Sequence, residues 1–157
     1  MYRFWVFVHL VGVVGFLLTH GVAMWTMFAV RAVGTDRERI LDRCETSKAT
    51  TMPMYISFGL LLLGGIAAGI DGALFAEWWL LGSLLLLLAL TASMSMIASP
   101  YMKRLREGCT RWADGTFMMS DEELEAVLAG PVTMITAASG SIGLLTIVFL
   151  MVFKPGS

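Results

Sequence analysis

The sequence predicts an all-α protein, a membrane-embedded four-helix bundle that forms a single domain over residues 1–157. Hydrophobic residues make up 57% of the chain and charged residues only 15%, and the mean hydropathy is +0.78. A soluble domain has about 25% charged residues, which keep its surface wetted. The composition therefore indicates a protein surrounded largely by lipid. It also excludes a disordered chain, and 11 Lys and Arg against 12 Asp and Glu exclude a strongly basic nucleic-acid binder.

A membrane-spanning helix requires about 20 mostly apolar residues, and four stretches of the chain qualify. The first stretch is too long for the apolar region of a cleaved signal peptide. The third contains five consecutive leucines, Leu84 to Leu88, without the alternation of a transmembrane β-strand. Because backbone groups in lipid must bond internally, each stretch is expected to be helical. The four spans cover approximately residues 4–30, 54–70, 78–99 and 132–153.

The basic residues predict the orientation. Nine of the 11 lie in the connections that follow the first and third spans, whereas Arg3 and Lys154 lie on the opposite side. Loops rich in Lys and Arg remain in the cytoplasm. We therefore expect a multi-pass protein of a bacterial inner membrane with both termini outside. The nine residues are Arg31, Arg37, Arg39, Arg43, Lys48, Lys103, Arg104, Arg106 and Arg111.

The two basic connections are expected to contain short helices. Residues 35–38, Thr-Asp-Arg-Glu, match a capping box with Thr35 as the N-cap, and we expect the helix to continue to about Thr46. Residues 120–123, Ser-Asp-Glu-Glu, match a second capping box, and Gly130-Pro131 is a strong stop signal for its helix. These elements predict a compact cap on the cytoplasmic side.

Small residues suggest where the spans pack against each other. Gly65 and Gly69 form a GxxxG pair in the second span, and Thr133, Ala137 and Ser141 lie four apart in the fourth. Small residues allow close approach of helix backbones in lipid, where no hydrophobic effect drives association. We expect both faces to be packing surfaces.

The two histidines, His9 and His20, are the candidate cofactor ligands. They lie in the first span, 11 residues apart, which places them on one helix face and roughly 16 Å apart along the axis. They cannot both ligate one metal ion, but either could bind the iron of haem b, and of the two His9 is the preferred ligand. Gly12, one turn from His9, would leave room for a flat ring. The alternatives are a hydrogen bond to a hydroxyl or a backbone carbonyl of a neighbouring span, or contact with a substrate or quinone.

The 12 methionines raise the alternative of copper, because thioether sulfur suits Cu(I). Met52 and Met54 form one M-x-M pair, and Met94 and Met96 form another. However, residues i and i+2 of a helix face different directions, so neither pair should close on one ion.

The residues do not predict a catalytic centre. Cys44 and Cys109 lie in the basic connections, where a reducing cytoplasm keeps them as thiols. No Asp, Glu, Lys or Arg lies inside a span, which argues against an acid-relay transporter.

Several short motifs resemble those of a known group of proteins. They are the run Phe7–Gly12, Pro53 at the start of the second span, Gly59 with Gly64-Gly65, Glu77-Trp78-Trp79, and the closing run Leu150–Pro155. Over nearly its whole length the chain resembles a family of small predicted four-helix bacterial integral membrane proteins of unknown function, akin to the CopD copper-resistance group. The resemblance implies copper uptake as one activity.

The membrane-bound protoporphyrinogen oxidases of the HemJ type are related to that group. They share the size, the four spans and a haem-binding histidine in the first helix, to which His9 would correspond. This chain lacks the charged intramembrane partner of those oxidases.

Taken together, the sequence predicts a small inner-membrane protein without its own catalytic centre, acting as a component or subunit of a larger assembly. The alternatives are a b-type haem protein, for electron transfer or HemJ-like porphyrin oxidation, and CopD-like copper uptake. The expected partners are the lipid bilayer and other membrane subunits or further copies of the chain, and not nucleic acid.

Overall fold

The computed structural model describes residues 1–156 and confirms the all-α prediction. Within these residues there is no β-strand, and an antiparallel bridge joins Arg111 to Phe117 in the loop before α5. The elements are α1 (Tyr2–Ala32), α2 (Arg37–Ala49), α3 (Thr51–Asp71), the short 3-10 helix η1 (Leu74–Ala76), α4 (Trp78–Gly108), α5 (Asp121–Ala129) and α6 (Val132–Phe153).

Four helical segments are long and apolar enough to cross a membrane, as the sequence predicts for a multi-pass membrane protein. The outward faces of these helices are also apolar: Leu63, Leu85 and Leu145 are 67%, 68% and 69% exposed. Apolar area in water costs about 25 cal/mol per Å² relative to an apolar surrounding. The outer surface of the bundle is therefore suited to lipid.

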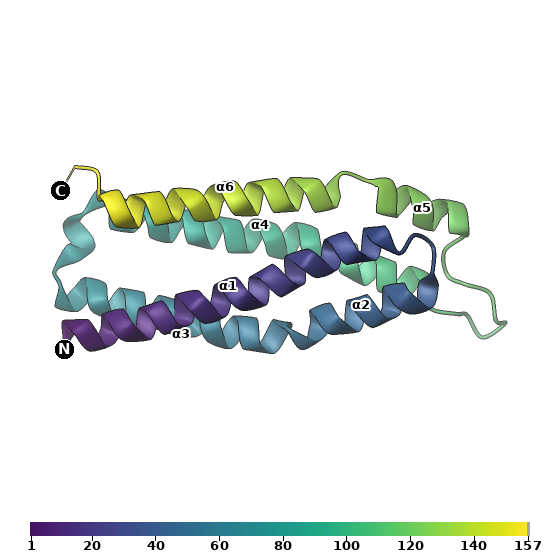
Figure 1. Cartoon of the computed structure of the whole chain (residues 1–157), viewed down its shortest axis with the longest axis horizontal. Coiled ribbons are helices and arrows are strands. Elements are labelled where there is room, and N and C mark those ends of the chain that lie inside the picture. Colours follow the sequence, from purple (N-terminus) through teal and green to yellow (C-terminus); the bar gives the residue numbers. More distant parts are fainter. Residues whose placement is uncertain (157) are drawn as a thin grey trace.

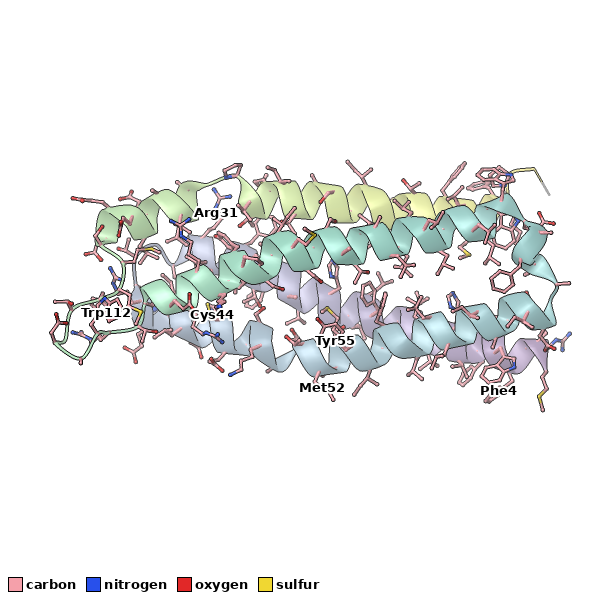
Figure 2. The ribbon with its side chains drawn as sticks, turned by 180° about the vertical axis from the view of Figure 1, so that it is seen from behind. Phe4, Arg31, Cys44, Met52, Tyr55 and Trp112 are labelled. Atoms are coloured by element: carbon pink, nitrogen blue, oxygen red, sulfur yellow. The ribbon has the colours of Figure 1, made fainter. Side chains whose placement is uncertain are left out.

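The four long helices form two antiparallel hairpins, α1 with α3 and α4 with α6 (Figure 1). Both chain termini lie at one end of the bundle, which we call the terminal end, and α5 lies at the other, the basic end (Figure 1). Figure 2 shows Phe4 at the terminal end and Arg31, Cys44 and Trp112 at the basic end. In the apolar region the two hairpins meet at few positions, so they are joined mainly at the basic end.

Two glycines allow α1 and α3 to pack backbone against backbone. A Cβ atom at Gly12 would lie 2.2 Å from the backbone nitrogen of Leu61, and one at Gly64 would lie 2.5 Å from that of His9. The close approach expected at the GxxxG pair occurs instead at Gly64, because Gly65 faces the imidazole of His9. Gly69, the other member of the pair, faces side chains of η1 and α4.

The packing face of α6 also differs from the expected one. The sequence suggested a spacing of four through Ala137 and Ser141, yet Ser141 is exposed and Ala137 only half-buried. The buried positions alternate between spacings of three and four, which follows the 3.6-residue period of a helix more closely. A Cβ at Gly143 would lie 2.3 Å from Leu90 of α4, so this glycine receives a side chain of its partner helix. The buried residues are Thr133, Thr136, Gly140 and Gly143.

The best-packed part of the molecule is the basic end, where α1, α2, α4 and α5 meet. Ile40, Leu105 and Leu124 have 0% exposure and belong to one apolar core with the end of α1. Helix α4 reaches this core because it continues through Pro100 to Gly108, well past the expected end of the third span. The predicted compact cap is confirmed.

The cap of α2 differs from the prediction by one residue. Asp36, not Thr35, is the N-cap, and its carboxylate accepts a hydrogen bond of 3.2 Å from the backbone N–H of Arg39. Aspartate and threonine both satisfy free amides at a helix start. The helix also continues beyond Thr46, to Ala49.

The second capping box is confirmed at the start of α5. The Ser120 hydroxyl accepts from the backbone N–H of Glu123 at 3.2 Å, and the Glu123 carboxylate accepts from that of Ser120 at 3.0 Å. The helix ends at Ala129, directly before the predicted stop at Gly130-Pro131.

Arg37 joins three elements of the basic end. Its guanidinium donates hydrogen bonds of 2.9 Å to the backbone carbonyls of Gly108 and Met119, and it forms an ion pair with Asp121. It also lies 4.1 Å from the centre of the Phe117 ring. Only 10% of the Arg37 side chain is exposed, so these partners replace the water that it has lost.

Both cysteines are buried in the same core, as free thiols. Burial raises the pKa of Cys44 to about 11, and the neighbouring thiol of Cys109 adds to this shift. Burial likewise raises the pKa of Cys109. Because the thiolate is the reactive form, both cysteines should be slow to react at neutral pH.

Candidate functional site: two cavities between the hairpins

Two cavities lie between the α1–α3 and α4–α6 hairpins. The larger has a volume of about 380 Å³ and extends toward the basic end, and the smaller has a volume of about 230 Å³ and lies toward the terminal end. Phe16, Leu87 and Leu144 line both cavities and so separate them. Clefts of about 300–1,000 Å³ are typical of sites for small molecules and cofactors. The larger cavity falls in this range.

His20 lines the larger cavity and makes no hydrogen bond to another described residue. Its ring stacks on Phe16, with 5.5 Å between the ring centres and an angle of 11° between the planes. A Cβ at Gly140 would lie 3.8 Å from His20 Nε2 and 3.9 Å from Met94 Sδ. The imidazole of α1 and the thioether of α4 therefore meet beside residue 140. The Met94 methyl group lies 2.7 Å from the same Cβ position, so the missing side chain of Gly140 makes room for Met94.

Methionines form much of the remaining wall. Met24 and Met27 come from α1, Met54 from α3, and Met94 and Met102 from α4. Their neighbours in the M-x-M pairs point elsewhere, since Met52 and Met96 are 68% and 78% exposed. The two members of each M-x-M pair therefore face different surroundings. The structure instead brings five methionines from three helices to the wall of this cavity.

Three basic residues contribute to the wall of the larger cavity at its basic end. They are Lys48, Lys103 and Arg106. Lys48 pairs with Glu45 at 3.5 Å, and Lys103 pairs with Glu107 at 3.7 Å. The half-buried guanidinium of Arg106 has no hydrogen bond or ion pair within residues 1–156. An anionic group in this part of the cavity could therefore form an ion pair with Arg106.

His9 lines the smaller cavity and is held by the neighbouring helix. Its Nδ1 atom lies 2.8 Å from the carbonyl oxygen of Leu61. A carbonyl can only accept, so Nδ1 carries the hydrogen in the neutral ring and Nε2 keeps the lone pair. Of the alternatives for the histidines, this is the hydrogen bond to a backbone carbonyl of a neighbouring span.

The predicted site residues are therefore not brought together. His9 and His20 line different cavities, which agrees with the argument that they cannot share a metal ion. Gly12 lies against the backbone of α3, because a Cβ there would be 2.2 Å from the Leu61 nitrogen. Within residues 1–156 no three His, Cys, Asp or Glu side chains are grouped as metal ligands.

The partners of His20 were not identified from the sequence. Met94 and Gly140 lie 74 and 120 positions along the chain from it, and neither stands in a motif that includes a histidine. Comparison with protein-family models, curated proteins and solved structures finds no match to this chain.

Proposed function

We propose that this chain is a multi-pass inner-membrane protein, without a catalytic centre of its own, that binds haem b in the larger cavity. The observation that carries the proposal is the pair of His20 and Met94 beside Gly140. A histidine with a methionine is an established axial ligand pair for haem iron in electron carriers. Bound haem would supply one-electron chemistry, and the chain would act as a subunit of an electron-carrying assembly.

The surrounding residues suit such a cofactor in three ways. Phe16 lies parallel to the His20 ring and restricts its rotation. The wall otherwise consists mainly of apolar side chains, which favour a flat apolar macrocycle. Arg106, which lines the basic end of the cavity and has no acidic partner within residues 1–156, would supply a cation for a carboxylate of haem.

The same ligand pair would also suit Cu(I), and the methionines of the wall favour soft metals. Two observations favour haem over copper. A bare ion does not require a cavity of about 380 Å³. In addition, the unpaired positive charge of Arg106 in the cavity wall repels cations and attracts anions.

The orientation belongs to the same proposal. The basic end should face the cytoplasm, because Lys- and Arg-rich connections are retained there. His20 then lies near the middle of the membrane, and the basic end of the larger cavity lies near the cytoplasmic headgroups.

Titration of detergent-solubilised protein with haem tests the proposal. We expect wild type to bind about one haem with a sharp Soret band, and His20→Ala to lose this binding. Met94→Leu should retain haem with an altered spectrum, since it removes one of the two residues that would hold the iron and leaves the other. His9→Ala is the matched control and should bind haem as wild type does.

The proposal is wrong if wild type does not bind haem, or if haem survives His20→Ala and is lost in His9→Ala. Stoichiometric binding of Cu(I) without haem would instead establish the copper alternative.

A further inference from the structure

The polar side chains of the smaller cavity offer free hydrogen-bond acceptors, whereas their donors are already used. His9 and Ser83 contribute the polar side chains to its wall. The Ser83 hydroxyl already donates to the carbonyl of Trp79 at 2.7 Å, and His9 Nδ1 donates to the carbonyl of Leu61 at 2.8 Å. His9 Nε2 and the lone pairs of Ser83 Oγ therefore remain as acceptors.

The position of the His9 ring is fixed by a glycine. A Cβ at Gly65 would lie 2.9 Å from His9 Nδ1 and 3.2 Å from Cε1, so only glycine leaves room for the imidazole there. The hydrogen bond to Leu61 then sets which nitrogen carries the hydrogen. His9 is thereby prepared as an acceptor before any ligand arrives.

The size of the cavity limits the enclosed part of the ligand to a small ring. Apolar cavities of about 150 Å³ bind benzene. The smaller cavity, at about 230 Å³, has room for one ring with substituents. His9 belongs to α1 and Ser83 to α4, so the acceptors stand on opposite hairpins. A ring with a hydroxyl on each side matches this arrangement.

We infer that the smaller cavity is a binding site for a lipid-soluble para-hydroquinone, with one hydroxyl donating to His9 Nε2 and the other to Ser83 Oγ. The site selects the reduced form of the ligand. The oxygens of a quinone are carbonyls, which only accept hydrogen bonds. They would therefore face the acceptors of the protein, His9 Nε2 and Ser83 Oγ, without a hydrogen between them. This inference is independent of the haem proposal, which rests on the other cavity.

The test compares three ligands with the same decyl-substituted ring: the benzohydroquinone, the benzoquinone and the dimethyl ether of the hydroquinone. Equilibrium dialysis under anaerobic conditions measures the affinity of each for the wild-type protein in detergent. A neutral hydrogen bond contributes about 1 kcal/mol net, or roughly fivefold in affinity. We expect the hydroquinone to bind at least that much more tightly than the other two ligands.

Two variants locate the selectivity. His9→Phe keeps a ring of similar size but removes the acceptor, so it should bind the three ligands with similar affinity. Thr19→Ala changes a residue of the same helix that lines neither cavity and should retain the preference of wild type. Ser83→Ala, a smaller change, should lower the preference in part.

Equal affinity of wild type for the three ligands would overturn the inference, and this result does not depend on any variant folding. A preference that persists in both His9→Phe and Ser83→Ala would also overturn it. A wild-type protein that does not bind haem would refute the haem proposal and leave this inference unaffected.

Discussion

Replacement of Arg37 should destabilise the protein far more than replacement of any exposed arginine. In Arg37→Gln the carbonyls of Gly108 and Met119 lose a charged donor, and Gly108 is buried. Hydrogen bonds to charged groups contribute about 1.5–3 kcal/mol each. Asp121 is 77% exposed, so its ion pair with Arg37 adds 1 kcal/mol at most. Together the two hydrogen bonds and the ion pair give an expected loss of about 3–7 kcal/mol in the free energy of unfolding.

Arg39→Gln is the matched control in the same helix. The Arg39 side chain is 71% exposed and pairs with Asp36 at a spacing of three residues, so its loss should cost less than about 1 kcal/mol. The free energy of unfolding in mixed detergent micelles, titrated with dodecyl sulfate and followed by circular dichroism, compares the two variants. Equal stability of Arg37→Gln and Arg39→Gln would refute the view that Arg37 holds the basic end together.

Three further predictions concern packing, capping and orientation. Gly64→Ala should lower the free energy of unfolding by about 1–3 kcal/mol, because its Cβ would lie 2.5 Å from a backbone atom of α1. Gly21→Ala, which meets nothing within 4 Å, should not lower stability, since alanine favours the helix more than glycine does; thermal unfolding in detergent distinguishes the two. Ser120→Ala should cost about 1 kcal/mol in the same assay, since one bond of the capping box is lost, and an unchanged midpoint would contradict this. In a variant without the native cysteines, an impermeant thiol reagent should label Ala76→Cys in intact cells and Ala113→Cys only after lysis; the reverse pattern would invert the orientation.

The spans and the second capping box could be predicted because the signals are local. Twenty apolar residues in lipid must form a helix regardless of their neighbours. The pair of Ser120 and Glu123 caps a helix through residues three positions apart. In the first connection two adjacent residues, Thr35 and Asp36, are both good caps, and the local pattern does not decide between them.

The packing faces and the site depend on contacts between distant residues, which a single sequence does not encode in any local pattern. Gly64 and Gly65 are adjacent glycines, and only the crossing of α1 over α3 determines which of them meets a backbone. Likewise, the missing side chain of Gly140 matters only because α1 and α4 bring His20 and Met94 beside it. The two histidines were identified from sequence as polar groups in lipid, but their separate environments required the structure.

The most direct test of the account is the reduced-minus-oxidised absorption spectrum of the wild-type protein as purified from membranes, measured together with its iron content. The proposed role of His20 and Met94 predicts a b-type spectrum and about one haem iron per chain. A protein that is folded by circular dichroism, yet shows no Soret band and no iron when purified from haem-supplemented cells, would contradict it.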